Sequence, residues 1–497
     1  MQSTSESSLP LRSIVTPGPR TALVWLASLG LGALAVWTVY GARPGLGWSL
    51  FALGLAAATL AVERPSLREL TAPRYQAIGL LVLLSAAEAI TADGGDQFLL
   101  LVGIGWLGAV SVACAATRST RPGIGRLVVA PFAAPLRVTR SAAEAIGSGV
   151  RSAGSEESAP LLRGALLALA CVAILGALLG EADPTLGAAR DAVFRLIVGL
   201  DGIGRIAFFA LVAFAVLGFL HRTSRGAGRE DDEPQAGARR HTDLERLIVV
   251  GSVAALFATF LALQLASLFG NPGARTGSGV TLAQAVHRGF TEISVVVALT
   301  SAIIALLERG AVRGPRERWV RAVEFAVIGA CLLLLASAYF RLSQYELAYG
   351  YTAFRMYVRL YIGALAIVSI LLGHELIVGI DVDRYCWRAA VTFLATLAIL
   401  GFWNYPAWIV RANVERYVQS GQIDLRYLAR TGPNGIPALV ESLGYLGPDE
   451  RRALAPVVAP ERSDGGSHGS PGRPWYEWNL RRTQADTAVT EHARDPR

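Results

Sequence analysis

The sequence contains no lysine, so arginine alone carries its basic charge. That absence excludes a P-loop lysine, a Schiff-base lysine and the ATP-contacting lysine of protein kinases. Charge is also scarce, because only 17% of the 497 residues are charged whereas 53% are hydrophobic. This composition predicts a chain with many bilayer spans rather than an ordinary soluble protein.

Cysteine is scarce too, with Cys114, Cys171, Cys331 and Cys386 lying inside or beside apolar runs and forming no CxxC pair. This pattern favours small buried side chains over a metal or redox site. The chain also lacks HExxH, GxSxG and metal-ligand spacings, the motifs of proteases, esterases and metal hydrolases. We therefore expect no metal and no cofactor, and we find no catalytic motif that would make the protein an enzyme.

What the sequence does contain is apolar runs of about 20 residues, the length that crosses a bilayer as a helix. We predict an all-α, polytopic helical membrane bundle of about eleven transmembrane helices, with a small helical extracytoplasmic tail at the C-terminus. Frequent Ala and Gly in these runs suit close helix packing in lipid. The predicted spans are Thr21–Tyr40, Gly45–Val62, Tyr75–Ala92, Phe98–Thr117, Leu161–Leu179, Gly202–Leu220, Leu247–Phe269, Phe290–Leu307, Ala322–Phe340, Met356–Val378 and Ala389–Val410.

The arginines gather in alternate loops between these runs, and cytoplasmic loops are the ones that carry such an excess. We therefore predict a multi-pass cell-membrane protein with a cytoplasmic N-terminus and an extracytoplasmic C-terminus. Because the arginines do not form a compact basic domain, the net charge of +8 gives no support for nucleic-acid binding. The five groups are Arg12 and Arg20, then Arg64 to Arg74, Arg118 to Arg151, Arg222 to Arg240, and Arg309 to Arg318.

These features divide the chain into six predicted segments. They are a cytoplasmic N-terminal tail (1–20), a four-helix membrane segment (21–117), a cytoplasmic Arg-rich amphipathic linker (118–160), a seven-helix membrane core (161–410), a small helical extracytoplasmic segment (411–446) and a flexible tail (447–497). In the linker, Arg126–Arg151 mixes apolar and Arg residues, with Pro131 and Pro135 predicted as breaks. It is either a helix on the anionic inner leaflet or a solvated linker.

One stretch, Ser337–Tyr357, joins two apolar runs yet is dense in Tyr, Arg, Gln and Glu. An ionisable group inside a span costs roughly 2.5–3.5 kcal/mol on insertion scales, so such groups are functional candidates. Tyr351, Arg355 and Arg359 are four apart and share one helix face. The residues that we predict for a ligand-binding site at the outer face are Asp183, Asp191, Glu292, Arg341, Gln344, Tyr345, Tyr349, Tyr351, Arg355, Arg359 and Asn404.

Two interpretations of this outer site follow from the residue types. The guanidinium groups of Arg355 and Arg359 are suited to hold a phosphate or carboxylate of a lipid or solute. The interpretation that we favour is structural, with these groups pairing with Asp183, Asp191 or Glu292 or reaching the headgroups. Ionisable residues at the inner ends of the spans are expected to be solvated beside the cytoplasmic headgroups. They are Glu324, His374, Glu375, Asp381 and Asp383.

The polar stretch Ser337-Ala-Tyr-Phe-Arg-Leu342, with Tyr345, Tyr349-Gly-Tyr-Thr352 and Phe354-Arg355, resembles a signature of a bacterial multi-pass membrane family known as domain of unknown function 4173. The resemblance covers roughly residues 161–482, implies a helical membrane fold and carries over no catalytic residue. The sequence departs from the family at Tyr351, where Leu is expected, and at Asn404-Tyr-Pro, where Asn-Pro-Asp is expected. Further matches in order include Glu181-Ala-Asp-Pro184, Asn404-Tyr-Pro-Ala407, Asp424-Leu-Arg-Tyr-Leu428, Ile436-Pro-Ala-Leu439 and Trp478-Asn-Leu480.

Three functional hypotheses remain. The first is a transporter-like protein, or one that handles lipids or solutes, in which Arg355, Arg359 and Glu292 converge on a cavity. Its partners are membrane lipids, with an anionic lipid or a small solute at the outer face. The second is a non-catalytic signalling or assembly subunit, in which internal salt bridges consume these groups. The third is a membrane-embedded transferase for a lipid-linked substrate, with Asp183 or Asp191 as the base.

Overall fold

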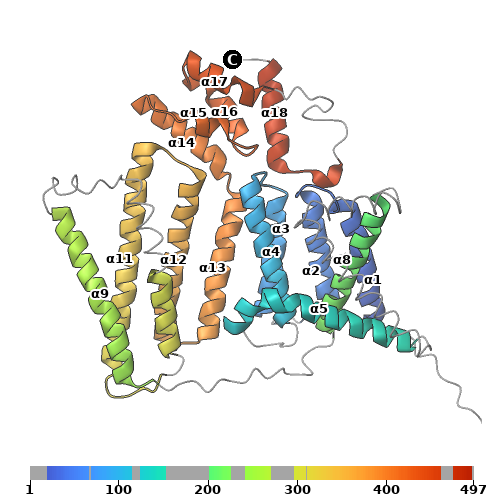
Figure 1. Ribbon diagram of the computed structural model, residues 1–497, viewed down its shortest axis with the longest axis horizontal. Helices are drawn as coiled ribbons and strands as arrows, with labels where there is room; N and C mark the ends of the chain where they lie inside the picture. The colour runs from blue at the N-terminus through green and yellow to red at the C-terminus, as the bar shows by residue number, and fades with distance from the viewer. Residues whose placement is uncertain are drawn as a thin grey trace, which may run out of the picture.

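The computed structural model describes residues 19–65, 69–114, 124–152, 201–224, 241–269, 296–308, 311–459 and 474–494. In these ranges the regular secondary structure is helical, apart from an isolated bridge between His241 and Ala311. The predicted all-α fold class is thereby confirmed. Figure 1 shows long helices standing side by side, short helices gathered over one end of them, and one helix lying across the other end.

Seven helices of the described ranges are long and apolar enough to cross a membrane. Three further predicted spans coincide with α3 (Pro73–Glu88), α9 (Asp243–Phe269) and the helical segment Val296–Glu308. The predicted span Leu161–Leu179 lies outside the described residues. The seven are α1 (Pro19–Thr38), α2 (Leu46–Glu63), α4 (Gly94–Cys114), α8 (Asp201–Ser224), α11 (Glu317–Tyr349), α12 (Ala353–Val378) and α13 (Val382–Phe402).

Helix α13 joins two apolar cores. Its residues Trp387 and Leu394 pack into a core built from α1 to α4, α5 (Ile124–Ser152) and α8. Near its start, Val382 and Tyr385 pack into a second core with α9, α11, α12 and the segment Val296–Glu308. Figure 1 shows α13 between these two groups of helices. The indole Nε1 of Trp387 also donates a hydrogen bond of 2.7 Å to Oε1 of Gln76 on α3.

Helix α5 lies across the ends of α2, α4 and α8 (Figure 1), and we call this the α5 end of the bundle. The predicted breaks at Pro131 and Pro135 are wrong, because the helix runs through both prolines. Proline has no N–H for the carbonyl four residues earlier. For Pro131 that carbonyl belongs to Leu127, and it accepts a 3.2 Å hydrogen bond from Nε1 of Trp106 on α4 instead.

Five short helices cover the opposite end of the bundle, which we call the capped end (Figure 1). The first four of them in the chain enclose a small apolar core of their own, centred on Val410, Leu428, Leu439 and Leu454. Two of them lie within 447–497, the segment predicted as a flexible tail. The helices are α14 (Tyr405–Ser420), α15 (Leu425–Ala429), α16 (Ile436–Ser442), α17 (Pro448–Val458) and α18 (Leu480–Arg494), and 3-10 turns lie at Glu69–Thr71, Leu443–Tyr445 and Trp475–Glu477.

Candidate functional site

The turn between α11 and α12 carries most of the predicted outer residues. Helix α11 ends at Gly350, whose φ of +82° is a conformation that side chains other than glycine rarely adopt. Thr352 then caps α12 by accepting the N–H of Arg355. The Asn413 amide of α14 receives the N–H of Tyr351 at 2.8 Å and donates to the carbonyl of Tyr351 at 2.9 Å. The turn is therefore fixed by the helices of the capped end.

Both predicted arginines make their contacts within the α11–α12 pair. Arg359 forms an ion pair with the buried Glu346, and its guanidinium lies 5.0 Å from the ring centre of Tyr339. Arg355 donates to the carbonyl of Gly350 and lies 4.4 Å from the ring centre of Tyr345. The carboxylate of this ion pair is Glu346 and not one of the predicted partners Asp183, Asp191 and Glu292, so the predicted pairings stay a prediction.

The other predicted residues are dispersed. The rings of Tyr345 and Tyr349 stack on one another, Tyr351 packs edge-on against Trp408, and Asn404 caps the start of α14. Arg341 and Gln344 are exposed on α11. Asp183, Asp191 and Glu292 lie outside the described residues.

A polar cluster that sequence reasoning missed lies between α4, α12 and α14. Oδ1 of the buried Asp96 accepts the hydroxyls of Tyr357 at 2.8 Å and Tyr405 at 3.0 Å, and the two hydroxyls lie 2.9 Å apart. Burial and the nearby charge of Asp96 raise the pKa of Tyr405 well above its usual range, so its hydroxyl stays a donor. The signals were present in Asp93-Gly-Gly-Asp96 and the Tyr-rich stretch, but nothing in the sequence connects them.

The C-terminal residues contact the bundle beside this cluster. Nδ2 of Asn479 donates to the carbonyls of Glu88 at 3.0 Å and Thr91 at 2.7 Å. The amide of Asn434 pairs with the N–H of Ala92 and the hydroxyl of Thr91, each at 2.8 Å. Two asparagines from the capped end thus help to satisfy the buried carbonyls and N–H groups of the α3–α4 turn, together with Gln97, which donates to the same Thr91 carbonyl at 3.0 Å.

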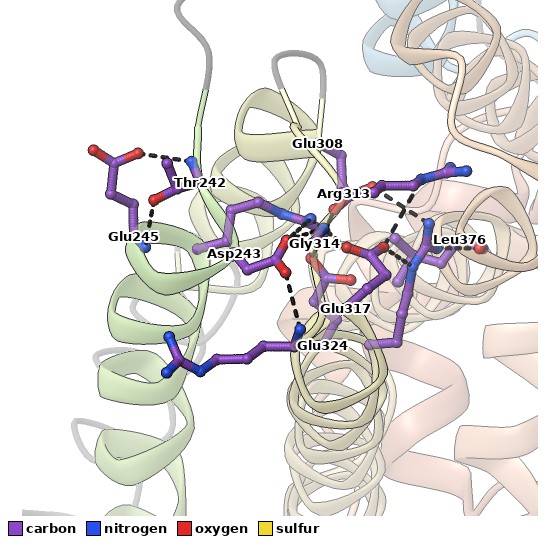
Figure 2. Close-up of polar contacts among 12 residues, drawn as sticks. Thr242, Asp243, Glu245, Glu308, Arg313, Gly314, Glu317, Glu324 and Leu376 are labelled. Carbon is purple, nitrogen blue, oxygen red and sulfur yellow. Dashed lines mark hydrogen bonds and ion pairs between the residues drawn. The ribbon is translucent and has the colours of Figure 1, made fainter.

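A buried network of arginine and carboxylates holds the other end together (Figure 2). Thr242 and Glu245 form a capping box at the start of α9. Asp243 accepts the N–H groups of Gly314 and Arg316, each at 3.0 Å, and so fixes the loop before α11. Figure 1 places this junction at the same end as α5.

Arg246 of α9 is the centre of this network, and its side chain is fully buried. It pairs with Glu308, with Glu317 at 2.8 Å and with Glu324 at 3.3 Å. Arg321 also contacts Glu317 and Glu308 and donates to the carbonyl of Leu376 on α12. The network therefore joins α9, Val296–Glu308, α11 and α12.

The expectation of solvated inner-end carboxylates is wrong for Glu324 and Glu375, which are fully buried. Glu375 receives Nε of Arg384 at 2.7 Å and Nη1 of Arg388 at 2.9 Å, which joins α12 to α13. The reason is that both carboxylates face neighbouring helices that bring arginine to them, as buried charges require. Asp381, in contrast, caps α13 by accepting the N–H of Arg384.

The structure also contains an apolar cavity of about 700 Å³ between α2, α3, α4, α5 and α8. Thr59 and Ser111 are the lining residues with hydroxyls, and each donates to a carbonyl of its own helix, at 2.7 and 2.8 Å. Gly105 and Gly108 of α4 line it too, and a Cβ added at either would meet no atom within 4 Å. The cavity thus offers apolar surface to an occupant.

Over the described ranges, no group of three or more His, Cys, Asp or Glu residues could hold a metal ion.

Comparison with known proteins identifies the family of the chain but identifies no activity. A family model described as "Domain of unknown function (DUF4153)" matches residues 78–442. The family number 4173 that the resemblance suggested is therefore corrected to 4153. No curated protein and no solved structure matches the chain.

Proposed function

Because the chain belongs to the DUF4153 family, whose description names no activity, we propose a function from the geometry: it is an integral membrane protein that handles lipids. It binds one acyl chain of a membrane lipid in the apolar cavity between α2, α3, α4, α5 and α8. The single observation that carries this proposal is the cavity itself. Its volume of about 700 Å³ is within the roughly 300–1,000 Å³ of small-molecule sites.

The chemistry of the lining selects the occupant. Both lining hydroxyls already donate within their own helices, so neither has a free proton to donate to a polar solute. An acyl chain carries no hydrogen-bonding groups, so it can fill the cavity without leaving any of them unsatisfied. Pro131 and Pro135 of α5 form part of the wall, and the exposed face of the same helix carries Val128, Phe132 and Leu136. That face is suited to lie in the lipid interface, where an acyl chain can enter.

The full span count and the orientation belong to this proposal. We infer eleven spans, with the α5 end in the cytoplasm and the capped end outside. What supports this is that Arg-rich groups lie at the helix ends of the α5 end (Figure 1), such as Arg222 in the last turn of α8 and Arg316 directly before α11. The amphipathic α5 lies at that end as well.

The contacts of the predicted outer residues decide how well each alternative function is supported. A signalling or assembly subunit is the second candidate, because Arg355 and Arg359 are engaged within the α11–α12 pair. Binding of an anionic lipid or small solute at the outer face requires Arg341 or Gln344, which are exposed there. A transferase that uses a lipid-linked substrate would depend on Asp183 or Asp191.

Filling the cavity tests the proposal. Gly108→Leu should lower the amount of lipid that remains bound in purified protein, because the leucine side chain would occupy part of the cavity. Bound lipid is counted by native mass spectrometry. Gly30→Leu is the matched control, because Gly30 is an exposed glycine of α1 with nothing within 4 Å. Equal lipid retention by the two variants would contradict lipid binding in the cavity.

A further inference from the structure

Glu88, the last residue of α3, is a buried carboxyl group that has no part in the proposed lipid site. Its side chain has no exposed surface, and neither Oε1 nor Oε2 has a hydrogen-bond partner. Every other buried carboxylate described above accepts a hydrogen bond or pairs with arginine. An isolated carboxylate is too costly to bury in its ionised form, so such a group takes up a proton instead.

The C-terminal docking segment (Trp475–Arg494) binds the backbone at the end of α3, beside this carboxyl group. The N–H groups of Leu480 and Arg481 donate to the carbonyls of Ala89 and Ile90 at 2.9 and 3.2 Å, directly after Glu88 in the chain. Asn479 binds the carbonyl of Glu88 itself. Figure 1 shows α18 standing over the ends of the bundle helices at the capped end. Removing this segment would open the end of α3 to water.

We propose that Glu88 is a proton-binding site whose protonation is coupled to docking of the C-terminal segment. With the segment docked, Glu88 is enclosed and carries a proton. With the segment detached, Glu88 meets water and ionises as an ordinary glutamic acid does, near pH 4.3. The charged groups near Glu88 on the packed elements are Arg482 of α18 and Asp96 of α4.

The docked and detached states of the C-terminal segment bind different numbers of protons, and this difference sets how docking depends on pH. At neutral pH the docked state holds one proton that the detached state has lost. Raising the pH therefore favours detachment, by up to tenfold for each pH unit, until Glu88 ionises in the docked state as well. Lowering the pH toward the range of a free glutamic acid strengthens docking and then has no further effect. This coupling is independent of lipid binding in the cavity.

Amide hydrogen exchange of the full-length protein in lipid nanodiscs tests the coupling. In the wild type, the protection factors of the Leu480 and Arg481 amides should fall between pH 6 and pH 8 by up to tenfold per unit, after correction for intrinsic exchange. In Glu88→Gln, which cannot ionise, protection should not change with pH. Glu491→Gln removes an exposed carboxylate of the same helix and should keep the wild-type fall.

A second variant keeps the test decisive if Glu88→Gln does not fold. Arg482→Gln removes the cation that favours the ionised form, so the loss of protection should extend to higher pH than in the wild type. Protection that is independent of pH in the wild type would overturn the proposal. So would a fall that persists unchanged in Glu88→Gln, or an Arg482→Gln profile that moves to lower pH.

Discussion

Nη2 of Arg246 on α9 lies 3.3 Å from Oε1 of Glu324 on α11, and both side chains are fully buried. Glu308 and Glu317 complete the contacts of the same guanidinium. The three carboxylates come from two different helices, and Arg246 adds a third helix. Removing Arg246 would therefore leave the buried Glu324 without its ion-pair partner, while Glu308 and Glu317 would keep their contacts with Arg321. Leaving one buried charge unpaired is the costly way to break a buried ion pair.

Arg246→Met should accordingly destabilise the protein by roughly 3–5 kcal/mol. The measurement is the midpoint of thermal unfolding in detergent, followed by circular dichroism. Arg452→Gln is the control, because Arg452 and Asp449 form an exposed pair at 3.3 Å whose loss should have no measurable effect. Equal midpoints for Arg246→Met and Arg452→Gln would show that the network does not stabilise the bundle.

The Asp96 cluster predicts a difference between two substitutions at one position. Asp96→Ala leaves the hydroxyls of Tyr357 and Tyr405 without their acceptor and should cost about 1–3 kcal/mol. Asp96→Asn keeps an oxygen acceptor in place and should cost less. Limited trypsin digestion measures the effect, since loss of the cluster should speed cleavage in α14 more for the alanine variant. The same cleavage rate in both variants would exclude the hydroxyl contacts as the cause.

The hydrogen bond from Trp106 to the carbonyl of Leu127 predicts coupling between two helices. Trp106→Phe removes the donor and should lower stability by about 1 kcal/mol. Pro131→Ala supplies a backbone N–H that can satisfy the same carbonyl. In the Pro131→Ala background, Trp106→Phe should therefore have a smaller effect on the unfolding midpoint. If the effects of Trp106→Phe and Pro131→Ala on the unfolding midpoint simply add, the Leu127 carbonyl is not the partner that the two substitutions share.

The orientation is tested by reporter fusion. A periplasmic-type reporter fused after Leu446 should be active, and the same reporter fused after Arg229 should be silent, because the first position is predicted to be outside and the second in the cytoplasm. The reverse pattern would contradict the orientation and would place α5 on the outer leaflet.

The sequence predicted the helices better than it predicted their polar contacts. An apolar run marks α12 within three residues at either end, because burial in lipid requires a continuous apolar stretch. The run predicted for α13 starts seven residues after the helix begins and continues past its end into α14. The course of α5 was not predictable from its prolines, since the rescue of the Leu127 carbonyl depends on Trp106 of another helix. Local rules for proline cannot include a donor that only the tertiary structure supplies.

The polar sites show the same limit at longer range. Arg355 and Arg359 lie one turn apart on α12, because their spacing of four is a local property. Tyr351, which was predicted on the same helix face, lies instead in the turn before α12 begins at Ala353. Asp96 and Tyr405, in contrast, are 309 positions apart in the sequence and meet through their hydrogen bond. Arg246 belongs to none of the five Arg-rich groups that indicate the orientation. The three carboxylates around it lie more than 60 positions further along the chain. Only the packing of helices reveals such partners.

The most direct test of lipid handling is to find where an acyl chain lies in the protein. Phospholipid with a photoactivatable group at the end of one acyl chain is incorporated into nanodiscs, and the cross-linked peptides are identified by mass spectrometry. Labelling should concentrate on cavity residues of α4 and α5, such as Gly108 and Pro135, and should be lost in Gly108→Leu. Labelling confined to exposed lipid-facing positions such as Leu26 of α1, and unchanged in Gly108→Leu, would contradict the account.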